Sequence, residues 1–109
     1  MGMDDDLVKD DVMSDYFGDD QVRAIINLKV DTMSVEDIAE ELSVLDVVED
    51  VYLVTGDTDI VLNLRFHDYP QLKRFLVGSL AGIEGVNDIR TLMVVSVFKE
   101  RGSRSLETD

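Results

Sequence analysis

The chain has 109 residues, which fits one domain and leaves no room for a second of ordinary size. Its formal net charge is −14, and because so acidic a body repels phosphate backbones, we expect no direct binding to DNA or RNA. It has no cysteine and no apolar run near the ~20 residues that cross a bilayer. We therefore expect a cytoplasmic protein without disulfides, a thiol nucleophile or a membrane span.

Residues 1–20 form an acidic leader: they contain eight Asp and one Lys, so they carry −7 of the net charge of −14. Within it, Val8, Val12 and Tyr16 recur at i, i+4 spacing, and Gly18 is placed to end a helix. This pattern predicts a short amphipathic helix whose apolar side packs on a neighbouring subunit. An acidic disordered tail is the alternative.

Strict alternation of apolar residues over residues 22–30 predicts a strand with one buried face. Ser34 then stands where a helix cap is expected, and apolar residues follow at helical spacing over residues 35–45. Residues 47–55 are rich in β-branched and aromatic side chains and predict a second strand. The Gly-Asp-Thr-Asp sequence at residues 56–59 predicts the tight turn of a hairpin.

The second half of the sequence repeats the first. Residues 61–66 match residues 25–30 position by position and predict a third strand. Asp68 as a cap, with Pro70 in the first turn, predicts a second helix. A last strand is expected over residues 89–99.

Two strand–helix–strand units joined by a hairpin give the order βαββαβ. This order predicts a ferredoxin-like α+β fold of the dimeric α/β barrel type, in which a four-stranded antiparallel sheet carries two helices on one face. The first and third strands are expected at the centre of the sheet, because their inner faces are the most uniformly apolar. The domain is expected over residues 21–100, with a polar tail at residues 101–109.

The helices leave one sheet face open, and that face is expected to be partly apolar. The central strands place a mixed set of residues there: Ile25, Asn27, Val61, Asn63 and Arg65. The outer strands leave the phase undecided, with Tyr52 and Val54 or Val51, Leu53 and Thr55 from one, and Leu92, Val94 and Phe98 or Met93, Val95 and Val97 from the other. Because apolar patches of this size mark interfaces, we predict a two-fold homodimer formed sheet to sheet.

Signals for catalysis are weak. The chain has one His, His67, which is expected to be a solvated loop residue, and it has no Gly-rich phosphate loop. His and Cys at metal-ligand spacing are absent, and no serine has an obvious histidine partner. We therefore predict a protein that is not an enzyme and uses neither a cofactor nor a metal.

The turn at residues 55–59 is the strongest candidate for a ligand site. As a hairpin turn alone, Gly56 supplies a positive φ and an Asp bonds its own backbone. Two carboxylates and two hydroxyls at the end of a sheet also suit an ammonium group or a polar amide ligand. Both interpretations, turn only and turn with ligand contact, remain open at this stage.

These residues carry a family resemblance. Val-Thr-Gly-Asp-Thr-Asp at residues 54–59, Ile-Glu-Gly-Val at residues 83–86 and Thr-Leu-Met-Val-Val at residues 91–95, ending at Lys99, resemble the effector-binding domain (RAM, ACT-like) of the Lrp/AsnC transcription regulators. The resemblance covers roughly residues 21–100. Thr58 departs from the family's usual aromatic, and Glu84 replaces the usual proline at the helix end.

The resemblance implies an amino-acid-sensing domain that forms dimers through its sheet and often octamers, with small effectors held between dimers. By position, Gly56, Asp57 and Asp59 would belong to the effector loop, and Thr91 to the strand lining the same site. Family members usually carry a helix-turn-helix domain before this one, and here an acidic leader of twenty residues stands in its place. The expectation is a stand-alone sensor that modulates transcription by assembly with a full-length Lrp/AsnC regulator.

Two other functions compete with amino-acid sensing. One is a pure assembly module without an effector, which the replacement at Thr58 suggests. The other is a small dimeric ferredoxin-like enzyme of the monooxygenase or isomerase kind. Such an enzyme needs polar side chains between helices and sheet, and the inward faces here are almost wholly aliphatic.

Overall fold

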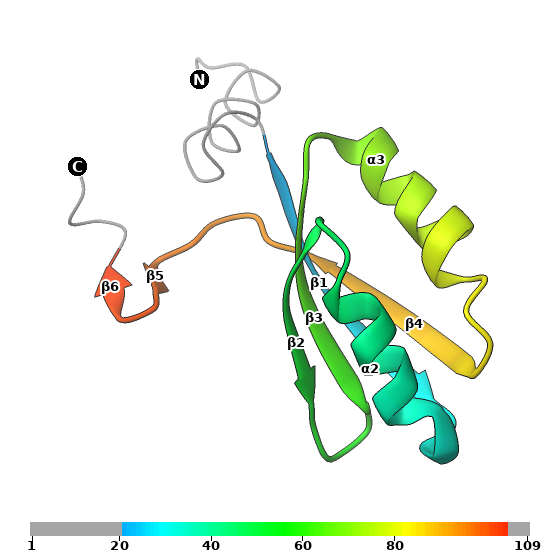
Figure 1. The fold of residues 1–109 in the computed structure, drawn as a ribbon. Coiled ribbons are helices and arrows are strands. Elements are labelled where there is room, and N and C mark those ends of the chain that lie inside the picture. Colours follow the sequence, from blue (N-terminus) through cyan, green and yellow to red (C-terminus); the bar gives the residue numbers. More distant parts are fainter. Residues whose placement is uncertain (1–20, 105–109) are drawn as a thin grey trace.

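The computed structural model describes residues 21–104, which form an antiparallel sheet in the order β2-β3-β1-β4 with two helices on one face (Figure 1). The four sheet strands are β1 (Val22–Val30), β2 (Val48–Leu53), β3 (Ile60–Phe66) and β4 (Val86–Met93). The helices are α2 (Val35–Ser43) and α3 (Tyr69–Arg74). The predicted βαββαβ fold and its central first and third strands are confirmed, whereas the predicted leader helix lies outside the described residues.

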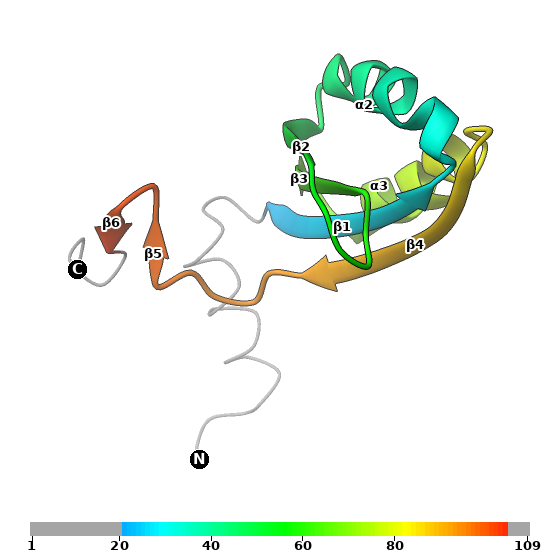
Figure 2. The same cartoon turned by 90° about the horizontal axis from the view of Figure 1, so that it is seen from below.

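Both helices pack on the same face of the sheet (Figure 2), and the core lies between the helices and the sheet. The alternation seen in the sequence places every second side chain of β1 and β3 in this core, and Ile26 and Leu62, which are paired across the strands, are fully buried. Ile38 and Leu42 enter the core from α2, and the segment after α3 contributes the ring of Phe75. All buried residues in the described part of the chain are apolar.

The two helices begin in different ways. Ser34 occupies the cap position of α2 as predicted, but its side chain makes no capping hydrogen bond, and a 3-10 turn, η1 (Thr32–Ser34), leads into the helix. At α3 the cap is complete, because the Asp68 carboxylate accepts a hydrogen bond from the backbone N–H of Gln71 at 2.9 Å. Pro70 lies in the first turn as predicted.

After α3 the chain continues as a π-helical segment, η2 (Phe75–Leu80). The wider turn joins residues five apart, so Phe75 and Leu80 can both face the sheet, and both are buried. Phe75 also packs against Phe66 of β3, with ring centroids 5.6 Å apart. None of the helices within residues 21–104 is long and apolar enough to cross a membrane.

The prediction of a last strand over residues 89–99 was wrong at both ends. The strand begins earlier, at Val86, and stops at Met93, which pairs with Ala24 near the start of β1. One further ladder bond, from the Val94 N–H to the Arg23 carbonyl, ends the pairing because β1 begins at Val22 and offers no further partner. β2 is likewise shorter than the predicted residues 47–55.

Beyond β4 the chain forms a small hairpin of β5 (Lys99–Glu100) and β6 (Ser103–Arg104). Arg101 and Gly102 make its turn with positive φ values of 51° and 83°. The predicted domain boundary at residue 100 falls inside this hairpin, and the division of the chain into leader, domain and tail stays a prediction.

Candidate functional site

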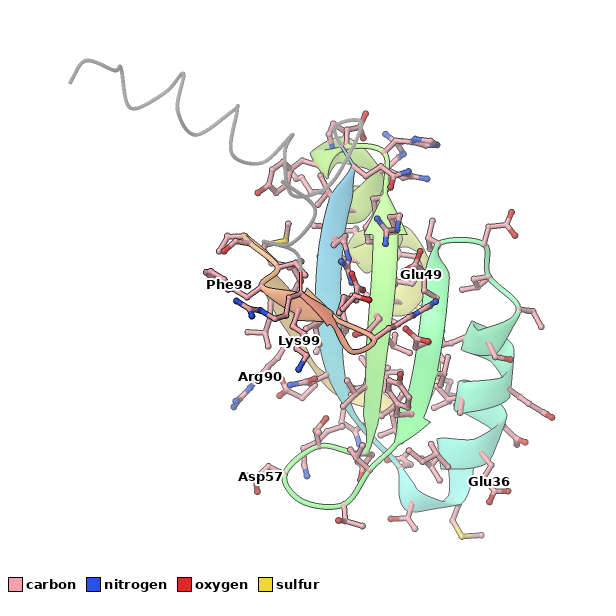
Figure 3. The ribbon with its side chains drawn as sticks, turned by 90° about the vertical axis from the view of Figure 1, so that its left-hand side faces the viewer. Glu36, Glu49, Asp57, Arg90, Phe98 and Lys99 are labelled. Carbon is pink, nitrogen blue, oxygen red and sulfur yellow. The ribbon has the colours of Figure 1, made fainter. Side chains whose placement is uncertain are left out.

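The strand register decides which side chains occupy the open face of the sheet, which Figure 3 shows from the front. Tyr52 of β2 pairs with Val61, and Leu92 of β4 pairs with Ile25, so the phase left undecided for the outer strands is the one that contains Tyr52 and Leu92. The five residues predicted for an interface all lie on this face, and all are half-buried: Ile25, Asn27, Val61, Asn63 and Arg65.

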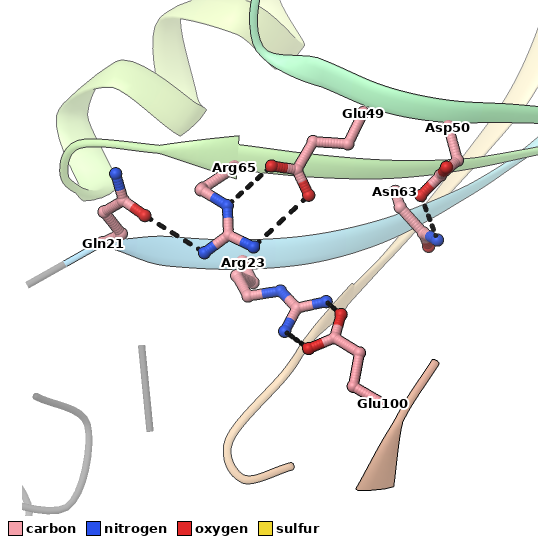
Figure 4. A network of polar contacts seen from close by, with 7 residues as sticks. All are labelled: Gln21, Arg23, Glu49, Asp50, Asn63, Arg65 and Glu100. Atoms are coloured by element: carbon pink, nitrogen blue, oxygen red, sulfur yellow. Dashed lines mark hydrogen bonds and ion pairs between the residues drawn. The ribbon is translucent and has the colours of Figure 1, made fainter. Parts of the chain in front are cut away.

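At one end of the open face, two arginines are bound by carboxylates (Figure 4). The Arg23 guanidinium donates two hydrogen bonds to Glu100 of β5, at 2.6 and 2.9 Å. The hydrogen bond from Arg23 lowers the pKa of the Glu100 carboxyl from its ordinary value of 4.5, and the nearby positive charges act in the same direction. This contact ties the C-terminal hairpin to the sheet.

The second arginine of this end, Arg65, donates to Glu49 at 2.7 and 3.4 Å and to the Gln21 side chain at 3.1 Å. Beside it, the Asn63 amide donates to the Asp50 carboxylate at 3.0 Å. These contacts join β2, β3 and Gln21, the residue before β1, and they pair Arg65 and Asn63 with other side chains of the chain itself.

The β5–β6 hairpin bridges the open face but does not fill it. A cavity of about 460 Å³, lined by Ile25 and Phe98 among others, lies beneath the segment that leads to β5. A second space of about 690 Å³ separates the hairpin from β2 and β3. Phe98 is 65% exposed and Leu92 is 53% exposed. Apolar surface on this side of the sheet therefore remains uncovered by the described chain.

At the other end of the open face, the β2–β3 turn is fastened to the end of β1. The Asp59 N–H donates to the Leu28 carbonyl at 2.8 Å, and one Asp59 carboxylate oxygen accepts from the Val30 N–H at 3.0 Å. The Thr58 hydroxyl donates to the same Leu28 carbonyl at 2.9 Å. Gly56 has a φ of +121°, a backbone conformation that L side chains rarely adopt. Asp59 and Thr58 thus hold the turn in place.

This turn forms one wall of a cavity of about 360 Å³, a size suited to a small ligand. Strand pairing brings the other walls together, because Asn27 is opposite Arg90 and Lys29 is opposite Asp88 on β1 and β4. We call this cavity the turn cavity, and its lining residues are Asn27, Lys29, Asp57, Thr58, Asp88 and Arg90.

The structure brings together only part of the predicted site. Asp57 lines the turn cavity, whereas Thr91 pairs with the buried Ile26 and so faces the helix side of β4. Lys29 and Arg90 were not predicted as site residues. Lys29 belongs to the open phase of an evident strand and could have been found, but Arg90 could not, because the phase of the last strand was undecided.

His67 is exposed at the end of β3, where its backbone N–H donates to the Gln71 side chain at 2.6 Å. Within residues 21–104 there is no group of three or more His, Cys, Asp or Glu side chains that could hold a metal ion.

A sheet with one face covered by helices, the other open and a polar cavity at the hairpin turn defines a ferredoxin-like α+β domain with a candidate ligand site. The family model described as the Lrp/AsnC ligand binding domain matches residues 23–104, and the chain belongs to this family. It is 35% identical over 81 residues to the HTH-type transcriptional regulator FL11 of Pyrococcus furiosus, a match that covers 72% of this chain and 52% of that protein. The chain thus spans about half the length of the relatives it matches.

Solved structures agree with the fold. A transcriptional regulator from Neisseria meningitidis in complex with L-Met superposes with a TM-score of 0.70 at 22% identity, covering 99% of this chain and 65% of that one. A protein from Thermus thermophilus gives a TM-score of 0.68 at 25% identity and covers 72% of this chain and 99% of that one.

Proposed function

We propose that this chain is an amino-acid-responsive assembly module that acts in transcription regulation in the cytoplasm. The observation that carries the proposal is that the turn cavity and the uncovered apolar surface lie on the same face of the sheet, with Asn27 of the cavity next to Ile25 of the apolar surface along that side of β1. A ligand bound in the turn cavity would therefore lie at the edge of the surface through which copies of the chain meet.

Assembly is supported by the character of the open face. Tyr52, Leu92 and Phe98 are each about half or more exposed, and the chain's own hairpin leaves cavities above the central strands. A second copy placed with its open face against the first would cover these side chains in a self-complementary contact. We propose that Ile25, Asn27, Val61, Asn63 and Arg65 form the centre of this dimer.

Ligand binding is supported by the turn cavity and by the relatives. The FL11 protein of Pyrococcus furiosus and the Neisseria meningitidis protein are transcriptional regulators, and the latter was solved with L-Met. In our proposal Gly56, Asp57 and Asp59 shape the effector loop, with Asp57 at the cavity wall. Thr91, on the helix side of β4, joins a site only where dimers pack against this edge, as in the octamer-type assembly that the family resemblance implies.

The same open face offers a route to a mixed assembly. A full-length Lrp/AsnC regulator carrying a similar sheet could pair with it in place of a second copy, and we propose such a regulator as the partner through which the chain acts. Co-expression of the chain with a tagged full-length regulator, followed by native mass spectrometry, should then give hetero-oligomers. Homo-oligomers alone would contradict this part of the proposal.

Assembly is tested by light scattering coupled to size-exclusion chromatography. We expect a dimer or larger species at micromolar concentration. Leu92→Asp places a charge within the contact and should give monomers, and because Leu92 is 53% exposed in the single chain, the fold should persist. Val44→Asp, at a residue 77% exposed and outside the sheet, is the matched control and should not change the mass. A wild-type protein that is monomeric would contradict the proposal.

Ligand sensing is tested by a thermal-shift screen of the twenty amino acids. A ligand at 100 times its dissociation constant adds about 2.7 kcal/mol of stability, which shifts the melting temperature of a domain of this size by several degrees or more. A protein that assembles but shows no shift would support the second candidate, an assembly module without an effector. The departure that favours this candidate is Thr58, whose hydroxyl is bonded to the Leu28 carbonyl.

A further inference from the structure

The four strands of the sheet carry four basic side chains, all on the open face: Arg23, Lys29, Arg65 and Arg90. They fall into two pairs. Arg23 and Arg65 stand at the end of the face where the C-terminal hairpin lies, and Lys29 and Arg90 line the turn cavity.

The two pairs differ in what they bind. Arg23 and Arg65 each donate two hydrogen bonds to one carboxylate, and their closest distances are 2.6 and 2.7 Å. In the turn cavity, Arg90 Nε is 3.8 Å from Asp88, and this weak ion pair has side chains 79% and 57% exposed. Among the described residues, Lys29 Nζ donates to one group, the backbone carbonyl of Asp57, at 3.3 Å. Both cations of the cavity therefore have hydrogen-bonding capacity left.

The charges of the turn cavity are balanced. Lys29 and Arg90 contribute two positive charges, and Asp57 and Asp88 contribute two negative charges, in a chain whose net charge is −14. A balanced cavity neither repels anions nor strongly attracts cations, so it suits a ligand that carries both signs. The guanidinium fork of an arginine matches a carboxylate in two parallel hydrogen bonds.

Resting on the proposed function, we infer that Lys29 and Arg90 bind the carboxylate of the ligand. The acidic rim of the turn cavity, Asp57 and Asp88, then receives its amino group. This arrangement favours free α-amino acids over their amides, which lack the carboxylate. It assigns the decisive role in recognition to two cations of β1 and β4 rather than to the turn alone.

The inference is tested by titration calorimetry with the tightest-binding of the twenty amino acids and with its amide. Arg90→Gln and Lys29→Gln should each weaken binding of the amino acid about tenfold, the loss expected for one charge-assisted hydrogen-bonding partner. The amide should bind the wild type about tenfold more weakly than the amino acid and should lose little further affinity in Arg90→Gln, because both changes remove the same contact.

The matched controls are Arg74→Gln and Lys73→Gln, which remove exposed cations of α3 on the other side of the sheet. Both should bind within about twofold of the wild type. All four substitutions are at exposed residues, and equal melting temperatures of the free proteins will confirm that the fold is kept.

The outcomes separate this inference from the proposed function. If amino acids bind and both cavity variants bind as well as the wild type, the carboxylate is held elsewhere and the inference is overturned while sensing stands. An amide that binds as tightly as the amino acid also overturns it. If none of the twenty amino acids binds the wild type, both the sensing proposal and this inference fall.

Discussion

The two ends of the open face differ in how their basic side chains are paired. At the hairpin end, Arg23 and Arg65 are each held by a carboxylate of the chain itself, Glu100 and Glu49. At the turn end, Lys29 and Arg90 lie beside acids but make no hydrogen bond to a carboxylate among the described residues. The cations of the hairpin end are paired with carboxylates, whereas those of the turn end line a cavity and have no carboxylate hydrogen bond within residues 21–104.

This difference shows that charge alone does not identify a binding site. Both ends hold two cations among acidic neighbours, and only the distances separate an internal network from a candidate ligand site. An ion pair that solvent reaches contributes about 0–1 kcal/mol to stability, so the charged pairs of both ends add little to the stability of the fold. The apolar core between the sheet and the helices stabilises the fold.

The largest effect is expected at the turn end, for Asp59→Ala. Its carboxylate accepts the Val30 N–H, and removing it leaves a half-buried donor without a partner, at a cost of about 1–3 kcal/mol. Asp57→Ala, at an exposed position two residues away, is the matched control and should change stability by less than about 0.5 kcal/mol. Urea unfolding measures both. Equal stabilities would mean that Asp59 does not fasten the turn.

The same pair sharpens the test of ligand sensing. Asp59→Ala would weaken a ligand site simply by loosening the turn, so its effect on binding does not isolate a contact. Asp57→Ala leaves those backbone bonds in place and reports on the cavity wall itself.

A smaller effect is expected for Gly56→Ala in the same turn. The φ of +121° strains any L side chain although the site has open space, so stability should fall by about 1 kcal/mol. Gly78→Ala is the control, because it also has open space but no positive φ, and it should be neutral or slightly stabilising. Thermal unfolding distinguishes the two, and equal melting temperatures would show that the turn tolerates a side chain.

The smallest effect belongs to the hairpin end and depends on pH. The Arg23 hydrogen bond lowers the pKa of Glu100 in the folded protein, so its stabilisation is complete above the ordinary value of 4.5 and is lost as the pH falls through the lowered pKa. Because the Glu100 side chain is 46% exposed, the effect should not exceed about 1 kcal/mol.

Glu100→Gln removes this contribution at every pH. Urea unfolding from neutral pH into the acid range should therefore give wild-type and variant curves that differ at neutral pH and converge in acid. A constant difference over the whole range would contradict the role of the Arg23 contact.

Much of the fold followed from local patterns. The alternation in β1 and β3 and the Asp68–Pro70 helix start are set by neighbouring residues, and all were confirmed. The predicted bounds of the last strand were wrong because its length depends on where its partner β1 begins, and β1 is far away in the sequence. The Ser34 cap failed in part because a 3-10 turn precedes the helix there.

Less of the candidate site than of the fold could be predicted from the sequence. Asp57 could be singled out from the turn chemistry, and it does line the turn cavity. The role of Asp59 could not be foreseen, because its partner is a backbone group of Val30, 29 residues away. Thr91 was grouped with the turn by resemblance, and within one chain it faces the helix side of β4.

The sequence by itself determined the repeat, the buried faces of the central strands and the conformation of the turn, since each depends on local geometry and on the two-residue period of a strand. Only the tertiary structure decided which phase of β4 faces outward, because a shift of one residue in register moves every side chain to the other face. That register places Arg90 opposite Asn27 and beside Lys29, and it thereby creates a cavity that no single segment contains.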